Sequence, residues 1–219
     1  MARGTSEGCD RPGATLDTFD IYEGAIARAL GNLRTWEACY TRERSAAAGL
    51  VAELLARSGE QRKLILRNSR RFNTWGVCER LVAEAWDVAR TSPRQAETLA
   101  DLALRVADRL DVRYGRPAIE DLRTRSWTCL GTARCRRADL AGAEQALRSA
   151  YRHLRRGTGD PVELALFLDL AASLLSARRK FCAALRLLRG AHAAFLSVGD
   201  RQRAGRALRD LSREMPVSP

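Results

Sequence analysis

Apolar residues recur at helical spacing along almost the whole chain, and no segment alternates apolar and polar residues for long enough to indicate a strand. Pro93, Pro117 and Pro161 each stand where a new periodic segment begins, and proline is tolerated in the first turn of a helix but disrupts later turns. Short links containing Gly, Asp or Pro separate these segments. The sequence therefore predicts an all-α protein with helices paired in order, at about 93–110, 117–137, 139–156, 161–179, 180–199 and 200–214.

The chain before residue 93 is predicted to hold a tail and further helices. Residues 1–17 are rich in Gly, Ser, Thr and charge, which predicts a disordered tail, and a second short tail is expected at 215–219. Helical periodicity begins at residue 18. Ser45 is predicted to cap a helix that ends at Gly59, Asn68 to close a short helix, and a longer helix to follow at about 72–89.

Composition argues against a membrane protein. The hydrophobic fraction is 46% and the charged fraction 29%. No apolar run approaches the roughly 20 residues that a membrane helix needs. The N-terminal residues contain no apolar stretch of the kind that a secretory signal requires. We therefore expect a cytoplasmic protein without a membrane partner.

The six cysteines are scattered, which argues against a disulfide framework and against a zinc site. Cys129 and Cys135 are the nearest pair, but six residues turn a helix by about 600°, so the two lie on different faces. His153 and His192 do not stand at a zinc-finger interval from any cysteine. We expect free thiols that pack as small apolar groups, and no metal or cofactor.

The sequence contains none of the short motifs that mark common enzymes. It has no phosphate-binding G-x-x-x-x-G-K-[ST] loop, no G-x-S-x-G nucleophile turn and no H-E-x-x-H metal motif. Cys182 and His192 are close only in sequence and form no recognisable nucleophilic pair. We therefore expect a protein without catalytic activity.

Charge is strongly basic and concentrated toward the C-terminus. The net charge is +12, and arginine supplies nearly all of the basic residues. Residues 171–219 hold ten basic and three acidic residues, a net charge of +7. A field of this kind attracts an acidic partner, either an acidic protein segment or a nucleic acid.

The stretch from Trp127 to Ala150 resembles the tetratricopeptide repeat, a helix–turn–helix unit of about 34 residues with the pattern W-x2-L-G followed by A-x3-F. Gly131 and Ala143 are the small residues predicted to let the two helices approach closely. Arg134 replaces the aromatic residue that the family usually carries. The signature residues of this unit are Trp127, Leu130, Gly131, Leu140, Ala143, Leu147 and Ala150.

Further copies extend the resemblance over most of the chain. A degenerate unit pairs the helix around Trp86 with one around Ala96, and the last helix resembles the first helix of a fourth unit. Segments 67–85, 114–135 and 157–174 are also similar to a group of bacterial tetratricopeptide proteins with regulatory or signalling associations. The signature residues of the unit after Ala150 are Ala172, Phe181, Ala184, Leu188 and Ala191.

The resemblance implies a short right-handed α-solenoid of antiparallel helix pairs at 72–214, preceded by an N-terminal helical region at 18–71. In the family, the first helices line a concave groove that holds an extended peptide or a partner helix. Arg206, Arg209 and Arg213 share one helix face, where their guanidinium groups could bind carboxylates. We therefore expect a scaffold that docks an acidic peptide or helix of another protein. The implied groove residues are Arg125, Thr128, Thr132, Arg136, Asp169, Ser173, Arg206, Arg209 and Arg213.

Nucleic-acid binding is the alternative. It is favoured by the isoelectric point of about 10.4 and by the basic run at 67–71. Against it, the sequence has no recognition-helix motif, no zinc finger and no basic stretch interleaved with exposed aromatic residues. The four tryptophans stand at apolar helical positions and are predicted to be core residues.

Overall fold

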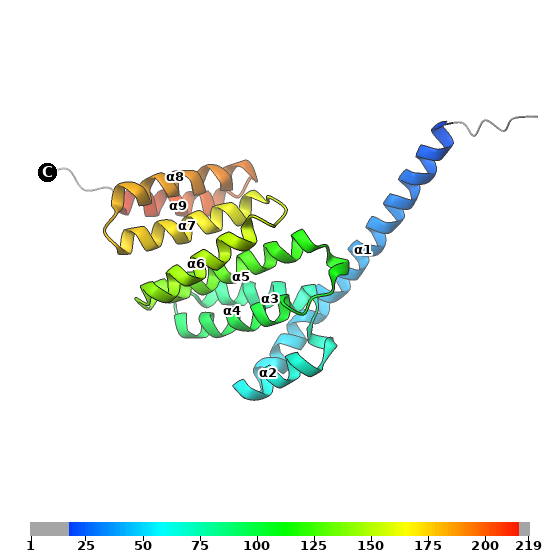
Figure 1. Cartoon of the computed structure of the whole chain (residues 1–219), viewed down its shortest axis with the longest axis horizontal. Helices are drawn as coiled ribbons and strands as arrows, with labels where there is room; N and C mark the ends of the chain where they lie inside the picture. Colours follow the sequence, from blue (N-terminus) through cyan, green and yellow to red (C-terminus); the bar gives the residue numbers. More distant parts are fainter. Residues whose placement is uncertain (1–17, 215–219) are drawn as a thin grey trace, which may run out of the picture. The chain divides into compact units, whose positions relative to one another are not determined.

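The computed structural model describes the chain from residue 18 to residue 214, apart from the side chains of 18–22, 25, 28, 32 and 210–214. The tails predicted at 1–17 and 215–219, and with them Cys9, lie outside the described residues. Every regular element within 18–214 is helical (Figure 1). The elements are α1 (Thr18–Leu55), α2 (Gly59–Asn68), a short 3₁₀ helix η1 (Arg70–Phe72), α3 (Trp75–Val88), α4 (Pro93–Ala107), η2 (Val112–Tyr114), α5 (Arg116–Arg136), α6 (Leu140–Leu154), α7 (Pro161–Ala177), α8 (Phe181–Ser197) and α9 (Arg201–Glu214).

The predicted starts of the later helices are confirmed, whereas the prediction that a helix begins at Ser45 is wrong. α4 and α7 begin at Pro93 and Pro161, and α5 begins one residue before Pro117. α1 passes through Ser45 without interruption. The Ser45 hydroxyl donates to the Arg42 carbonyl (2.8 Å) of the same helix and does not cap a new one.

The boundary between α1 and α2 is made by Ser58, a signal that the sequence analysis missed. The Ser58 hydroxyl accepts from the Gln61 backbone, and the Gln61 side chain accepts from the Ser58 backbone, which forms a capping box. Gly59 is therefore the first residue of α2 and does not stop the preceding helix. α2 ends at Asn68, as predicted. α3 starts at Trp75 and is capped by Thr74, slightly later than predicted.

The described chain divides into two units between Thr41 and Arg42, inside α1. The boundary predicted from the sequence lies near residue 71 instead. Ala47, Val51 and Leu54 at the end of α1 are buried, and so is Phe72. Residues 42–71 therefore share one unit with the helices that follow. No described helix combines the length and apolar character needed to cross a membrane.

Helices of the larger unit pack in sequential pairs: α3 with α4, α5 with α6, and α7 with α8, while α9 packs on α8 (Figure 1). α5 also contacts both α3 and α4, and α7 contacts both α5 and α6. Each new pair therefore rests on both helices of the pair before it.

Small residues occupy the closest approaches between helices. A Cβ added at Gly131 of α5 would lie 2.6 Å from Leu170 Cδ2 of α7 and 3.2 Å from Ala146 Cβ of α6. Ala143 and Ala184 have no exposed surface. Gly131 and Ala143 thus lie at close-packed positions, as predicted. Gly131 also allows α7 to approach α5 closely.

Aspartates hold the link between α6 and α7. Asp121 of α5 accepts hydrogen bonds from the Thr158 backbone N–H (3.1 Å) and from the Thr158 hydroxyl (2.6 Å). A side chain at Gly157 would collide with this carboxylate, and Gly159 has a φ of +83°. Asp160 then caps α7 by accepting from the Val162 N–H (2.8 Å). These contacts set the position at which α7 begins.

Alanine at Gly49 and alanine at Gly76 are expected to change stability in opposite directions. A Cβ at Gly49 in α1 meets nothing within 4 Å, so Gly49→Ala should raise the free energy of unfolding by about 0.5–1 kcal/mol. A Cβ at Gly76 in α3 would lie 2.5 Å from the Glu43 carbonyl oxygen, so Gly76→Ala should lower it by about 1–3 kcal/mol. Urea denaturation followed by circular dichroism measures both changes, and shifts of the same sign would contradict the packing of α3 on α1.

Candidate interaction surface

Thr128 was predicted to line a groove but lies inside the helix stack. It is fully buried, and its hydroxyl donates to the Thr124 carbonyl (2.8 Å) one turn earlier. Thr124 is equally buried and donates to the Glu120 carbonyl (2.9 Å). A hydroxyl that bonds its own helix backbone is satisfied without an external partner. Thr128 is therefore closed to a partner, contrary to its predicted role.

Arg125, also predicted to face a partner, is engaged within the chain. Its Nε lies 2.7 Å from Oε1 of Glu163, whose side chain is completely buried at the start of α7. Burial raises the pKa of the Glu163 carboxyl, and the charge of Arg125 only partly opposes that shift. The other carboxylate oxygen, Oε2, has no hydrogen-bond partner among the described residues. Arg125 therefore already balances a buried carboxylate of its own chain.

The remaining residues predicted for the groove stay nearer the surface. Thr132 is half-buried and donates to the Thr128 carbonyl (2.9 Å). The side chain of Arg213 lies outside the described residues. Asp169 is half-buried, and Arg136, Ser173, Arg206 and Arg209 are exposed.

Trp86 of α3 packs against the last three helices of the chain. Its indole reaches from α3 to a buried cluster formed by α7, α8 and α9. The Nε1 atom of the indole is buried and has no hydrogen-bond partner among the described residues. The cluster that receives it comprises Ala165, Leu166, Ala191, Phe195 and Ala204.

The repeat-signature residues pack between helices with one exception. Phe181 is 39% exposed, because it is the first residue of α8 and follows the exposed Lys180. It does not fill the contact between helices that was predicted for it. Trp127, Leu140 and Leu147 are half-buried. The buried members are Leu130, Gly131, Ala143, Ala150, Ala172, Ala184, Leu188 and Ala191.

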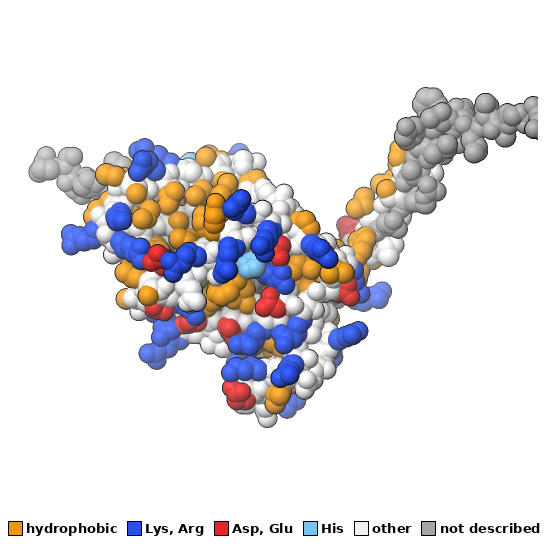
Figure 2. All heavy atoms as spheres, in the orientation of Figure 1, with side chains coloured by type: hydrophobic (Ala, Val, Ile, Leu, Met, Phe, Trp, Pro, Cys, Tyr) orange, Lys and Arg blue, Asp and Glu red, His pale blue; other side chains and the backbone are white. Residues whose placement is uncertain are grey.

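A hollow of about 600 Å³ lies against α6 and α7, on a surface that the sequence analysis did not consider. This volume is within the range of pockets that bind small groups or side chains. In Figure 2, hydrophobic side chains gather over α7 and α8, with basic side chains around them. We call this hollow the α6–α7 pocket. It is lined by Gln145, Leu147, Arg148, Ser149, Tyr151, Arg152 and Phe167.

An aromatic pair forms the apolar part of the α6–α7 pocket. The rings of Tyr151 and Phe167 lie 5.9 Å apart between centroids, at an interplanar angle of 33°. The Arg155 guanidinium lies 5.9 Å from the centre of the Tyr151 ring, within reach of a cation–π contact. Tyr151 nevertheless remains 49% exposed. Tyrosine and arginine are enriched among the few residues that contribute most of the binding energy at protein interfaces, and both lie here at the surface.

Arginines at the edge of this pocket carry charge that the chain does not neutralise. Within the described part of the chain, no carboxylate pairs with Arg152 or Arg155, and Arg152 donates only to the Ser149 hydroxyl (3.0 Å). Arg148 lies 3.2 Å from Glu144, which it shares with Arg178. Many other arginines of the described chain form ion pairs with carboxylates, as Arg125 does with Glu163. The pocket edge therefore presents unneutralised guanidinium groups.

The sequence held a signal for this surface in YRHLRR at 151–156, an aromatic residue followed by basic ones. Helical periodicity places Tyr151 on the outer face of α6. It does not tell which residue of α7 lies beside it, so the pocket could not be derived from spacing.

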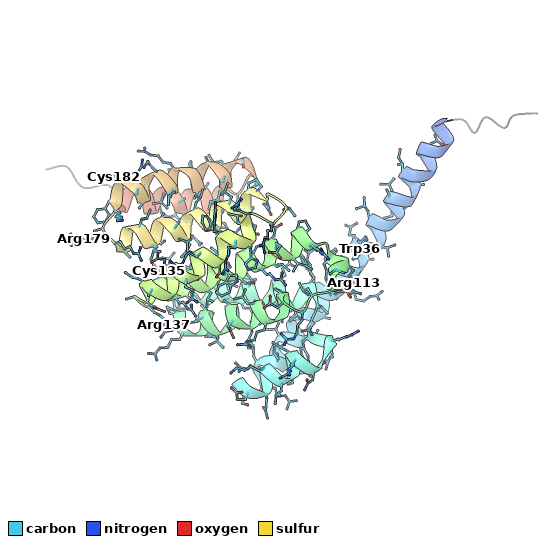
Figure 3. All side chains as sticks on the ribbon, in the orientation of Figure 1. Trp36, Arg113, Cys135, Arg137, Arg179 and Cys182 are labelled. Atoms are coloured by element: carbon cyan, nitrogen blue, oxygen red, sulfur yellow. The ribbon has the colours of Figure 1, made fainter. Side chains whose placement is uncertain are left out.

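Neither a cluster that could hold a metal ion nor an ionised buried thiol is found among the described residues. No group of three His, Cys, Asp or Glu side chains there could hold a metal ion. Burial raises the pKa of the Cys78 and Cys129 thiols to about 12, so neither is a thiolate at neutral pH. Cys135 and Cys182, labelled in Figure 3, stand on different helices, near the end of α5 and at the start of α8.

Comparison of the chain with protein-family models, with curated proteins and with solved structures finds no match.

Proposed function

We propose that the larger unit is a short right-handed α-solenoid of the tetratricopeptide type. The pairs α3/α4, α5/α6 and α7/α8 are its units, and α9 caps the last pair. Two observations support this arrangement. Each later pair contacts both helices of the preceding one, and Gly131 admits both α6 and α7 at one close approach.

We further propose that the protein is a non-enzymatic scaffold that binds an acidic segment of a partner protein at the α6–α7 pocket. The observation that carries this proposal is an aromatic hollow of about 600 Å³ beside Arg152 and Arg155, with which no carboxylate of the described residues pairs. An apolar side chain of the partner would enter between Tyr151 and Phe167. Carboxylates flanking that side chain would bind Arg152 and Arg155, and the net charge of +12 would speed their encounter.

A selection from a random peptide library on the nuclease-treated protein tests this function. Peptides with an aromatic or aliphatic residue flanked by Asp or Glu should be enriched. Fluorescence polarisation with a selected peptide should then show about tenfold to thirtyfold weaker binding by Tyr151→Ala and by Arg152→Glu, which is the effect of losing an interface hot spot.

Two variants serve as matched controls. Phe181→Ala removes an exposed aromatic ring outside the pocket, and Arg94→Glu makes the same charge change on α4. Both should bind the peptide within about threefold of the wild type, since charge reversals outside an interface act mainly on encounter rates. Equal losses in the pocket and control variants would overturn the assignment of the pocket.

Nucleic acid remains the second candidate, favoured by the isoelectric point of about 10.4. Labelled single-stranded and duplex oligonucleotides distinguish it. A steep fall of affinity with salt, weakened alike by Arg94→Glu and Arg152→Glu, would indicate binding through general charge and not through the pocket.

A further inference from the structure

The first half of α1 presents an apolar stripe to solvent. Within residues 18–41, the side chains of Ile26, Leu30, Leu33 and Trp36 are 57%, 51%, 63% and 36% exposed. Trp36 was predicted to be a core residue, and its exposure contradicts that prediction. The rings of Trp36 and Tyr40 stand 6.2 Å apart, so the stripe ends in an aromatic pair.

The stripe has the spacing of a coiled coil. Ile26, Leu33 and Tyr40 follow one another at seven-residue intervals, and Ala29 and Trp36 stand three residues after the first two. These are positions a and d of a heptad, with Leu30 at the adjacent position e. In sequence the same spacing starts at 19 and 22, so the seam covers three heptads, the length at which such a pattern becomes diagnostic.

A helix with this composition needs another helix beside it. Glycines at 24 and 31 lower its intrinsic stability, and a side chain at Gly31 would meet nothing within 4 Å. Most helical stability in proteins comes from packing an apolar face against another element and not from intrinsic propensity. Both glycines fall at position f, opposite the seam, so they leave the apolar positions intact.

The charge of residues 18–41 favours a second copy of the chain as the partner that covers the apolar stripe. Residues 18–41 contain two basic and three acidic residues, a net charge of −1, in a chain of net charge +12. Two copies therefore repel each other much less along this helix than over the rest of their strongly basic surface. An acidic partner segment, by contrast, is drawn to the arginines of the larger unit. In a self-pairing each copy also buries its own four exposed apolar side chains, so eight leave water together.

The acidic residues also select the orientation of the two helices. Glu23 and Glu37 both stand at position e. In an antiparallel pair, Glu23 lies beside Glu37 of the other copy, and like charges repel. In a parallel pair, position e faces position g, and positions 25, 32 and 39 carry no acidic residue. We propose that residues 18–41 pair with the same residues of a second copy as a parallel two-stranded coiled coil.

Sedimentation equilibrium of the full chain, from about 1 to 100 µM, tests this proposal. The wild type should show twice the chain mass of 24.3 kDa. The double variant Leu33→Glu/Trp36→Glu places charge in the seam and should show a single chain mass, with association weakened at least a hundredfold. A single chain mass for the wild type at every concentration would overturn the proposal, as would a dimeric double variant.

Controls separate loss of pairing from loss of folding. Leu64→Glu makes the same change at a leucine of α2 that is 57% exposed, and it should dimerise like the wild type. The double variant should keep the thermal transition of the larger unit, since its substituted side chains are exposed. Dimerisation lost equally in Leu64→Glu would place the interface elsewhere.

Glu37→Lys tests the orientation. In a parallel pair it meets no acidic residue of the other copy, so dimerisation should be unchanged or weaker. In an antiparallel pair it would face Glu23, and dimerisation stronger than in the wild type would rule out the parallel arrangement. Peptide binding at the α6–α7 pocket is measured separately, so this proposal and the proposed function can fail independently.

Discussion

Replacing Arg125 with methionine is expected to lower the free energy of unfolding by about 3–5 kcal/mol at pH 7, the cost of leaving one member of a buried ion pair alone. Glu163 is completely buried, and Arg125 is the charged group within hydrogen-bonding distance of it, 2.7 Å from Nε to Oε1. Urea denaturation followed by circular dichroism measures the loss.

The deficit of this variant should depend on pH. Burial raises the pKa of Glu163 above its ordinary value of 4.5, and removing Arg125 takes away the charge that opposes the shift. A carboxyl whose pKa is higher in the folded state than in the unfolded state binds more protons in the folded state than in the unfolded state. Stability therefore falls as the pH rises from 4.5 through the folded pKa, and it is regained as the pH falls. The deficit should shrink from pH 7 toward pH 5, and an equal deficit at both would contradict a charged, buried Glu163.

Removing both members of the pair tests the same interaction from the other side. Arg125→Met with Glu163→Leu removes both charges of the pair, so the double variant should recover to within about 1–2 kcal/mol of the wild type. Arg105→Met is the matched control. Its partner Asp101 is 2.8 Å away and both side chains are well exposed, so the loss should be about 0.5 kcal/mol or less. A control loss as large as that of Arg125→Met would show that methionine itself is poorly tolerated.

Replacing Gly131 with leucine is the second change with a large expected effect, a loss of about 3 kcal/mol or more through overpacking. A Cβ alone would come within 2.6 Å of Leu170 and 3.2 Å of Ala146, so the longer side chain forces α5 away from both α6 and α7. Ala143→Glu should be similarly destabilising, because it buries a carboxylate without a partner. Urea midpoints measure both.

The matched control for Gly131→Leu is Gly49→Leu. A Cβ at Gly49 would meet nothing within 4 Å, the position is exposed, and leucine is a better helix former than glycine, so this variant should be slightly stabilised. Wild-type-like unfolding of Gly131→Leu would contradict the close approach of the three helices and, with it, the proposed solenoid.

The positions of the helices could be predicted because their signals are local. Pro93, Pro117 and Pro161 each mark a helix start within one residue, and the apolar period of 3.6 sets each helix type. The error at Ser45 also has a local cause. A serine hydroxyl can cap a helix or bond to a carbonyl of its own helix, and the sequence does not distinguish the two. Only the structure shows that Ser45 bonds to the Arg42 carbonyl.

The candidate surface could not be predicted, because it depends on contacts between distant residues. Arg125 and Thr128 stood on a plausible exposed face, yet the buried Glu163 engages the first and the helix stack covers the second. Tyr151 and Phe167 come from different helices, α6 and α7, which are joined by the link that Asp121 holds. The sequence alone thus determined the helical class, the helix order and the small residues at close approaches, since spacing within one helix decides these. Tertiary structure decided which arginines are neutralised and where the surface is hollow, since those properties depend on which helices lie side by side.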